Sequence, residues 1–354
     1  MKAAGPSQRQ ATGHWSGGPA GDSSLEAQND SPGQLPSIAP TGATIAPPKG
    51  NGILLLGADG FLGGNFRRYF ESHGRPVHAI GRAAGDLTDP AVADGIFATA
   101  PKVNRIFHLV TRQRTGAIQY DIQGELLAIN SRIHLNVLEA WRRHQPQAKL
   151  ITAGSSCAYP ESDRPLAESA FQTGPLHPSV EGYGLAKQLL AVGCDVYAKQ
   201  YGLHYLHCIL ATVYGPKDHK EPGRSHFMTA LLDRAVREMR EGGRQFTVWG
   251  QPGTVRELLY VDDEIEAVLA ADARFSDTIL NCAANQPVTI GEVAEAIVGV
   301  LDWHAEITYP ADSFQGTSFK VLDSSRFLQA TGWKPRFPLT KGLRLTLAED
   351  YGIH

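Results

Sequence analysis

A glycine-rich turn that follows a short apolar run is the feature that most constrains the fold. The run Ile53 to Leu56 has the length of a buried strand, and it leads directly into GADGFLG at 57–63. A helical pattern follows, with Phe66 and Phe70 on one face. Strand, glycine turn and amphipathic helix in this order form the context that a dinucleotide-binding unit requires. The sequence therefore predicts that a dinucleotide binds at this turn.

Each glycine of the turn has its own role in such a unit. Gly57 permits the tight turn, Gly60 lets the backbone approach a pyrophosphate, and Gly63 lets the helix pack closely on the strand. The pyrophosphate is then expected at the N-terminus of the helix. The residues of the turn predicted to bind the cofactor are Gly57, Gly60, Phe61, Leu62 and Gly63.

Strand and helix patterns alternate along the chain after this turn. Strands are predicted at 77–80, 105–109, 149–152 and 204–210, and long helices at 125–143 and 181–201. This alternation predicts an α/β fold with a Rossmann-type doubly wound parallel sheet. We expect the cofactor-binding domain over 50–215, with a later segment near 257–283 returning to it. Residues 216–354, with a helix at about 225–241, are predicted to form mainly a smaller C-terminal substrate-binding lobe.

Composition restricts the class of protein. Lys and Arg number 33 against 36 for Asp and Glu, so the net charge of -3 gives no argument for a nucleic-acid or membrane surface. The four cysteines are scattered without a CxxC pair, so neither a disulfide framework nor a metal site is expected. Residues 1–49 are rich in Gly, Pro, Ser, Ala and Gln and predict a disordered tail. Together these features favour a cytoplasmic enzyme.

A second motif pair predicts catalytic chemistry. GSSCAYP at 154–160 follows a predicted strand, and ligands bind at the carboxyl ends of parallel strands. Downstream, YGLAK places Tyr183 and Lys187 four residues apart, on one helix face. The ammonium is then expected to lie beside the phenol, favour its ionised form and make it a usable proton donor near neutral pH. For this pair alone, the alternative is a chance match on a helix.

The order of the motifs carries a resemblance to a known family. GADGFLG, SSCAYP, YGLAK, VYGP, SHFMTALLDRA, VWG and RELLYVDD resemble the extended short-chain dehydrogenase/reductases, also called the NAD-dependent epimerase/dehydratase family, from about residue 52 onward. Within that family the chain is similar to the GDP-L-fucose synthases, which are 3,5-epimerase-4-reductases. The resemblance implies NADPH-dependent epimerisation and 4-keto reduction of a nucleotide-diphospho-4-keto-6-deoxyhexose. The apolar positions of the helices at 125–143 and 181–201 exceed what one sheet face needs, which predicts a homodimer through a four-helix bundle of these helices.

The resemblance implies roles for individual residues. Cys157 corresponds to the base and His226 to the acid of the epimerisation, because a ketone at C4 acidifies the protons on C3 and C5. Ser155 and Tyr183 would bind the C4 oxygen, and Lys187 would tune Tyr183 and hold the nicotinamide ribose. The alternatives are a buried hydrophobic cysteine and a core histidine. The residues implied to bind substrate are Ser156, Thr212, Arg234, Trp249 and Arg256.

The tip of the second predicted strand bears on the choice of cofactor. An NAD enzyme commonly has an acidic residue there, whereas HAIGRAAGDL places Arg82 at that position. An arginine attracts a 2′-phosphate, so the sequence favours NADP(H) over NAD(H). Asp86 is expected near the adenine.

One segment departs from the family pattern and leaves alternatives open. LVTRQRTGAIQY at 109–120 replaces the family's Ala-Ala-x-Val-Gly-Gly and adds Arg112 and Arg114 near the expected substrate edge. A different nucleotide sugar, such as a heptose or an unusual deoxysugar, is therefore an alternative, as is a 4-ketoreductase or an epimerase acting alone. An alternative of another class is a non-catalytic, cofactor-sensing binding protein. Retention of the catalytic set with Cys157 and His226 argues against it.

Overall fold

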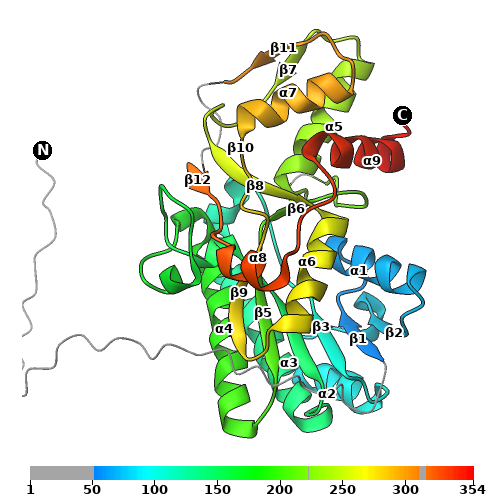
Figure 1. Ribbon diagram of the computed structural model, residues 1–354, viewed down its shortest axis with the longest axis vertical. Coiled ribbons are helices and arrows are strands. Elements are labelled where there is room, and N and C mark those ends of the chain that lie inside the picture. Colours follow the sequence, from blue (N-terminus) through cyan, green and yellow to red (C-terminus); the bar gives the residue numbers. More distant parts are fainter. Residues whose placement is uncertain (1–51, 222, 311–315) are drawn as a thin grey trace, which may run out of the picture. The chain divides into compact units, whose positions relative to one another are not determined.

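A six-stranded parallel sheet forms the centre of the protein, in the order β2-β1-β3-β4-β5-β9 (Figure 1). The computed structural model describes residues 52–221, 223–310 and 316–354, so the predicted tail at 1–49 lies outside the described residues. The strands are β1 (Ile53–Leu56), β2 (Val77–Ile80), β3 (Arg105–His108), β4 (Lys149–Ser155), β5 (Tyr205–Leu210) and β9 (Thr278–Cys282). All six run parallel, as the alternation of strand and helix patterns predicted.

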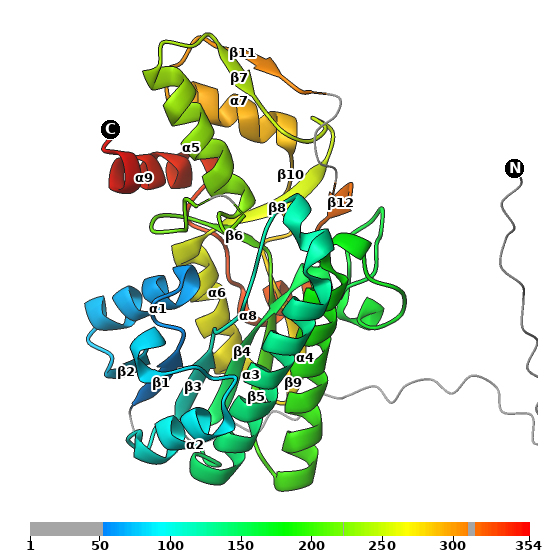
Figure 2. The ribbon, with the colours of Figure 1, turned by 180° about the vertical axis from the view of Figure 1, so that it is seen from behind.

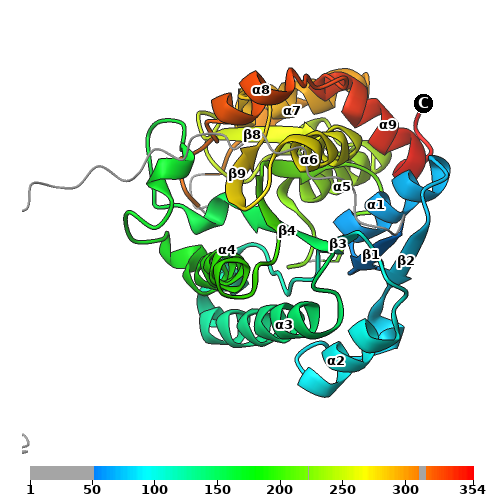
Figure 3. The same ribbon diagram turned by 60° about the horizontal axis from the view of Figure 1, so that its bottom comes forward.

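Helices cover both faces of this sheet (Figure 3). One face packs on α2 (Pro90–Thr99), α3 (Gln123–His144) and α4 (Glu181–Tyr201), which share a core with Leu54, Leu56 and Trp141. The other face packs on α1 (Phe61–Ser72) and α6 (Val261–Arg274), around a core that includes Leu55 and Phe107. Because β1 lies between these two cores, all four of its side chains are buried. The predicted doubly wound fold is confirmed.

The strand order reverses at β1, which pairs with β2 on one side and β3 on the other. In an open α/β sheet such a reversal leaves a crevice at the carboxyl ends of the strands. Gly57 lies at this point, because a Cβ atom added to it would meet the backbone of Leu109 and Val110, which follow β3. The fold thus places the glycine turn at the position where α/β proteins bind ligands.

A smaller group of elements lies beyond the carboxyl edge of the sheet (Figures 1 and 2). Its strand β8 (Val255–Tyr260) pairs with β6 (Thr212–Tyr214), β10 (Pro287–Thr289) and β12 (Phe319–Lys320), and β7 (Gln245–Thr247) pairs with β11 (Glu306–Thr308). The helices of this part are α5 (Phe227–Arg240), α7 (Ile290–Val300) and α9 (Leu339–Tyr351), and α8 (Ser325–Thr331) packs beside β9. Short 3-10 turns lie at Arg82–Ala84, Ala117–Asp121, Ser156–Ala158, Glu168–Ala170 and Pro178–Val180. Within the described ranges, every helix is too short or too polar to traverse a lipid bilayer.

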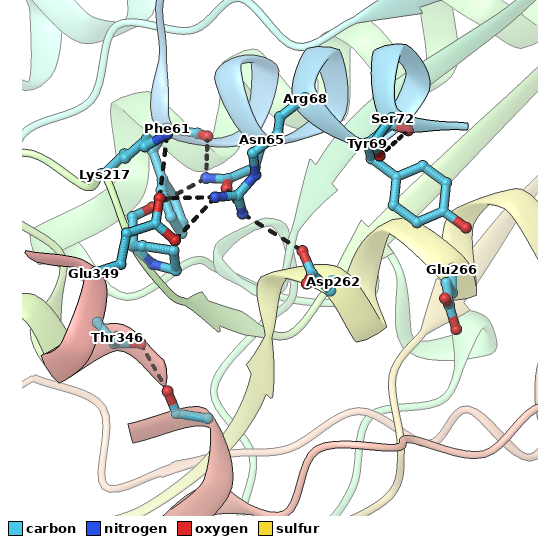
Figure 4. Close-up of polar contacts among 12 residues, drawn as sticks. Phe61, Asn65, Arg68, Tyr69, Ser72, Lys217, Asp262, Glu266, Thr346 and Glu349 are labelled. Carbon is cyan, nitrogen blue, oxygen red and sulfur yellow. Dashed lines mark hydrogen bonds and ion pairs between the residues drawn. The ribbon is translucent and has the colours of Figure 1, made fainter. Parts of the chain in front are cut away.

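A polar junction joins α1 to the C-terminal helix (Figure 4). Arg68 donates two hydrogen bonds to the carboxylate of Glu349, at 2.9 and 3.0 Å, and lies 3.7 Å from Asp262 of α6. A third hydrogen bond, of 2.7 Å, goes to Asn65, whose own amide donates to the carbonyl of Pro216. The helix that follows the glycine turn is therefore tied to three other parts of the chain.

Candidate active site

The glycine turn brings β1 and α1 into close approach. Gly57 has a φ of +92°, which L side chains rarely adopt. A Cβ atom at Gly63 would overlap the carbonyl oxygen of Gly57 and lie 2.5 Å from its carbonyl carbon, so only glycine fits there. The N-cap residue of α1 is Gly60, and no side chain caps this end. The first amide groups of α1 are therefore available to an anion such as a diphosphate.

A cavity of about 820 Å³ opens beside this turn. It is lined by the glycine turn, the tip of β2, the loop after β3 and the segment at 219–226, and its size suits a dinucleotide. Every residue predicted from the glycine turn and the β2 tip lines it: Gly57, Gly60, Phe61, Leu62, Gly63, Arg82 and Asp86. The described part of the chain therefore fits the cofactor expected from the sequence.

An acidic side chain that sequence reasoning missed lies at the tip of β2. The carboxylate of Asp59 accepts a hydrogen bond of 2.7 Å from the backbone N–H of Arg82, and both residues line the cavity. A Cβ atom at Gly81 would overlap this carboxylate, so glycine leaves room for the carboxylate in this position. The glycine turn and the tip of β2 thus present a carboxylate and a guanidinium to the same end of the cavity. Asp59 stands inside the glycine motif, which was the signal that could have identified it.

Ser155, Tyr183 and Lys187 come together at the carboxyl end of β4. Ser155 is the last residue of β4, and the ammonium of Lys187 donates a 2.8 Å hydrogen bond to the carbonyl of Ala153. That ammonium lies 5.7 Å from the centre of the Tyr183 ring. Tyr183 also interacts with the hydroxyls of Ser155 and Thr111. The two helical residues therefore face the strand that carries the serine.

The protonation of this group differs from the sequence expectation. Burial raises the pKa of Tyr183 above its ordinary value and lowers the pKa of Lys187 to about 8. The prediction that Lys187 favours the ionised phenol was wrong, because burial dominates the pKa of Tyr183 and the groups that lower it are the hydroxyls of Thr111 and Ser155. A protonated phenol is nevertheless the form that donates a proton to a reduced carbonyl oxygen.

Cys157 lies among cations rather than in an apolar core. Its sulfur accepts a 3.3 Å hydrogen bond from the ammonium of Lys320, and its backbone N–H donates to the Ser155 hydroxyl at 3.2 Å. Burial alone would raise the pKa of the Cys157 thiol, but Lys320, Ser155 and Arg256 together lower it below its ordinary value. A thiol in this setting can act as a base. Lys320 was missed by sequence reasoning, since a lone lysine near the C-terminus carries no motif.

His226 has an acceptor at each ring nitrogen. Its Nδ1 lies 2.8 Å from the carboxylate of Asp218, and its Nε2 lies 3.2 Å from the side-chain oxygen of Gln113. The Asp218 side chain is almost fully buried and also accepts a hydrogen bond from Thr229. Burial alone would raise the pKa of Asp218, but the hydrogen bonds from His226 and Thr229 lower it, so the carboxylate stays charged. These two contacts fix the orientation of the imidazole ring, and a ring nitrogen that carries a hydrogen is a potential proton donor.

The loop after β3 connects these groups. Thr111 interacts with Tyr183, and Gln113 contacts His226 two residues later. Buried Asn130 of α3 fixes this loop by bonding both the N–H and the carbonyl of Arg112. The predicted reduction residue Tyr183 and the predicted epimerisation residue His226 thus contact the same anchored loop. His226 also lines the cavity beside the glycine turn, whereas Cys157 does not.

The predicted substrate-binding residues lie mainly in the smaller group of elements. The guanidinium of Arg234 stacks 3.5 Å from the centre of the Trp249 ring, which is 61% exposed, and bonds the carbonyl of Thr247. An exposed ring backed by a cation is a surface on which a base or sugar can stack. Arg256 is paired in register with Lys320, while Thr212 begins β6. Ser156 is buried beside Cys157 in the turn after β4.

Comparisons with known proteins agree with this architecture. Residues 53–283 match the NAD dependent epimerase/dehydratase family. The probable GDP-L-fucose synthase 1 of Oryza sativa subsp. japonica is 30% identical over 307 residues, covering 85% of this chain and 92% of that protein.

Two solved structures have the same fold. The GDP-L-fucose synthetase of Naegleria fowleri bound to NADP superposes with a TM-score of 0.76 at 20% identity, covering 88% of this chain and 94% of that one. The GDP-6-OMe-4-keto-L-xylo-heptose reductase of C. jejuni gives 0.75 at 20% identity, covering 84% and 96%.

Proposed function

The chain belongs to the NAD dependent epimerase/dehydratase family, and from this premise we propose that it is a nucleotide-sugar epimerase and reductase. In detail, we propose NADPH-dependent 3,5-epimerisation and 4-keto reduction of a nucleotide-diphospho-4-keto-6-deoxyhexose. The relatives named as GDP-L-fucose synthases support this substrate class. The finer assignment rests on the chemistry of the site.

One observation carries the proposal. A reductase needs only a proton donor at the C4 oxygen, and the cluster of Ser155, Tyr183 and Lys187 would suffice for that. Two residues beyond Ser155, however, Cys157 is held among cations that lower the pKa of its thiol. A simple reductase has no use for a thiolate at this position, whereas an enzyme that removes protons from C3 and C5 requires a base there.

The proposed epimerisation uses one base and one acid. The Cys157 thiolate takes a proton from the carbon next to the ketone, and the negative charge passes to the C4 oxygen as an enolate. The Ser155 hydroxyl and the protonated phenol of Tyr183 stabilise that oxygen. The His226 imidazolium, held by Asp218, returns a proton to the carbon. Because this proton arrives on the face of the sugar opposite to the one from which Cys157 removed a proton, the configuration at that carbon is inverted.

The reduction uses the same carbonyl group. Tyr183 gives its proton to the C4 oxygen, and burial keeps the phenol protonated until then. The first amides of α1 and Arg82 would hold the dinucleotide, with Lys187 at its ribose. When bound, NADPH supplies the hydride that adds to C4. We propose NADP(H) rather than NAD(H) because Arg82 lines the cavity, and the Naegleria fowleri relative bound to NADP supports this choice.

The test is a reaction in deuterated water. The protein is incubated with GDP-4-keto-6-deoxymannose and NADPH, while mass spectrometry follows deuterium uptake into the sugar and absorbance follows NADPH oxidation. We expect both signals, and loss of the deuterium signal alone in Cys157→Ser, because a hydroxyl is a far weaker base than a thiolate. Reduction without deuterium at C3 or C5 in the wild-type protein would instead indicate a plain 4-ketoreductase.

A heptose nucleotide is a second candidate substrate, favoured by the loop after β3. Arg112, Gln113 and Arg114 line the cavity from this loop, and long polar side chains suit a sugar with an additional hydroxylated carbon. The same assay with a GDP-4-keto-heptose decides between the two. The preferred substrate is the one with the higher kcat/KM.

We also propose a homodimer formed through α3 and α4. These helices pack against each other, and both leave large apolar side chains exposed: Leu135, Leu185, Val192 and Val196 are 39–48% exposed. Light scattering at micromolar concentration should give twice the chain mass, and Val196→Asp should reduce it to a monomer. A monomeric wild-type protein would refute the proposal.

The four free cysteines support a reducing, cytoplasmic location for the proposed enzyme.

A further inference from the structure

We propose that Lys320 is a positioning residue that holds Cys157 as a thiolate for proton abstraction. The inference rests on the proposed function, since it assigns the origin of the base that the epimerisation requires. Its basis is the 3.3 Å hydrogen bond from the Lys320 ammonium to the Cys157 sulfur. The two residues lie far apart in the sequence and meet only through the fold.

Backbone pairing on both sides fixes the position of Lys320. It lies in the short strand β12, opposite Arg256 of β8, and Val255 donates a hydrogen bond to the carbonyl of Ser318 just before it. Immediately after it, Leu166 donates to the carbonyl of Val321. Pairing on both sides fixes the backbone from which the Lys320 side chain extends. From that position the ammonium reaches the Cys157 sulfur.

Lys320 is the cation that bonds the sulfur directly. The charged and titratable groups around Cys157 are Lys320 on β12, Arg256 on β8, and Tyr183 and Lys187 on α4. Lys187 donates to the carbonyl of Ala153, and Arg256 donates to that of Val255. Among the described residues, no carboxylate forms an ion pair with Lys320, so the thiolate is the anion available to it.

The contact has a defined role in the proposed reaction. The thiolate accepts one proton from C3 or C5 and becomes a thiol, while the electron pair of the C–H bond moves into the enolate. His226 then gives one proton to the carbon and becomes neutral. Exchange with solvent removes the thiol proton and restores the imidazolium, so no other reactant is consumed. Lys320 favours the starting state of this cycle because its positive charge stabilises the thiolate.

The first test measures the thiol without any sugar. The rate of alkylation of Cys157 by iodoacetamide is followed against pH by mass spectrometry, with Cys157→Ser as the blank. The other three cysteines are buried and should react slowly. The pH at the midpoint of this profile, called the midpoint below, reports the pKa of the Cys157 thiol. In Lys320→Met we expect the midpoint to rise by about one pH unit or more. Because a more basic thiolate is also more nucleophilic, the rate at neutral pH should fall only about threefold for a one-unit rise.

Matched variants separate charge from structure. Lys320→Arg retains the positive charge and should keep a midpoint near that of the wild-type protein. Lys334→Met removes an exposed lysine of the same lobe and should change nothing. Lys320→Gln provides a second neutral variant if the methionine variant unfolds. A neutral variant that folds and keeps the wild-type midpoint would overturn the proposal.

The second test connects the contact to catalysis. At neutral pH, Lys320→Met should slow deuterium exchange at C3 and C5 by about threefold to tenfold, because a one-unit rise leaves about one tenth of the thiolate but makes that thiolate a stronger base. Raising the pH should restore the exchange. Reduction of the 4-ketone should persist. A raised midpoint in a protein whose wild-type form exchanges no deuterium would support the Lys320 contact and refute the proposed epimerisation. An unchanged midpoint in Lys320→Met, together with normal deuterium exchange in the wild-type protein, would support the epimerisation and refute the role of Lys320.

Discussion

Gly63 and Gly64 are neighbours in α1, yet their replacement by alanine is expected to have opposite effects. A Cβ atom at Gly63 would lie 2.5 Å from the carbonyl carbon of Gly57 and overlap its oxygen, whereas one at Gly64 would lie 3.5 Å from the carbonyl oxygen of Ala58. To restore ordinary contact at Gly63, α1 would have to withdraw by about 1 Å. Such overpacking typically costs about 1–3 kcal/mol, against a gain of at most about 1 kcal/mol from alanine's helix propensity.

We therefore expect Gly63→Ala to lower the free energy of unfolding by roughly 1–2 kcal/mol and Gly64→Ala to raise it by up to about 1 kcal/mol. Withdrawal of α1 should also weaken NADPH binding by about tenfold or more in the first variant only, since the amides at its N-terminus would lose contact with the phosphates. Thermal unfolding and a fluorescence titration with NADPH measure the two effects. Equal behaviour of the two variants would refute the reasoning about this turn.

Four further variants have expected outcomes. Tyr183→Phe should abolish NADPH oxidation while deuterium exchange at C3 or C5 survives, and near wild-type reduction by this variant would disprove the role of the phenol. His226→Gln should impair exchange, measured in deuterated water, with NADPH affinity retained because the imidazole ring holds no phosphate. Asp59→Asn should strengthen NADPH binding relative to NADH binding, because it removes a negative charge near the expected 2′-phosphate. Arg82→Ala should weaken NADPH binding by about tenfold or more. Titration of each variant with NADPH and with NADH measures both effects.

The fold was largely predictable because its signal is local. The strand at 77–80 and the helix at 181–201 were predicted with the bounds that the structure has, since apolar runs and helical periodicity mark buried elements directly. The strand that ends at Ser155 was predicted too short, stopping at 152. Its last three residues, Ala153 to Ser155, are small, so hydrophobicity did not reveal that backbone pairing with β5 continues to Ser155.

The candidate site was only partly predictable. The resemblance supplied Cys157 and His226, but the groups that contact them include residues from distant parts of the chain. Lys320 lies in a strand of two residues that exists only through its pairing with β8, and Gln113 lies in a loop without periodicity. The effect of burial on Tyr183 was also missed, because a spacing of four residues reveals that two groups are neighbours but not how little water surrounds them.

The path of the chain between the sheet and the smaller lobe has a consequence for biosynthesis. The edge strand β9 joins the sheet only after β6, β7 and β8 have been made, and Arg68 finds its partner Glu349 close to the end of the chain. A nascent polypeptide that stops before Thr278 therefore has an open β5 edge, and its first helix lacks the contact with Glu349. Folding of the nucleotide-binding half should wait until β9 has been synthesised, so arrested chains that stop before Thr278 should remain sensitive to protease.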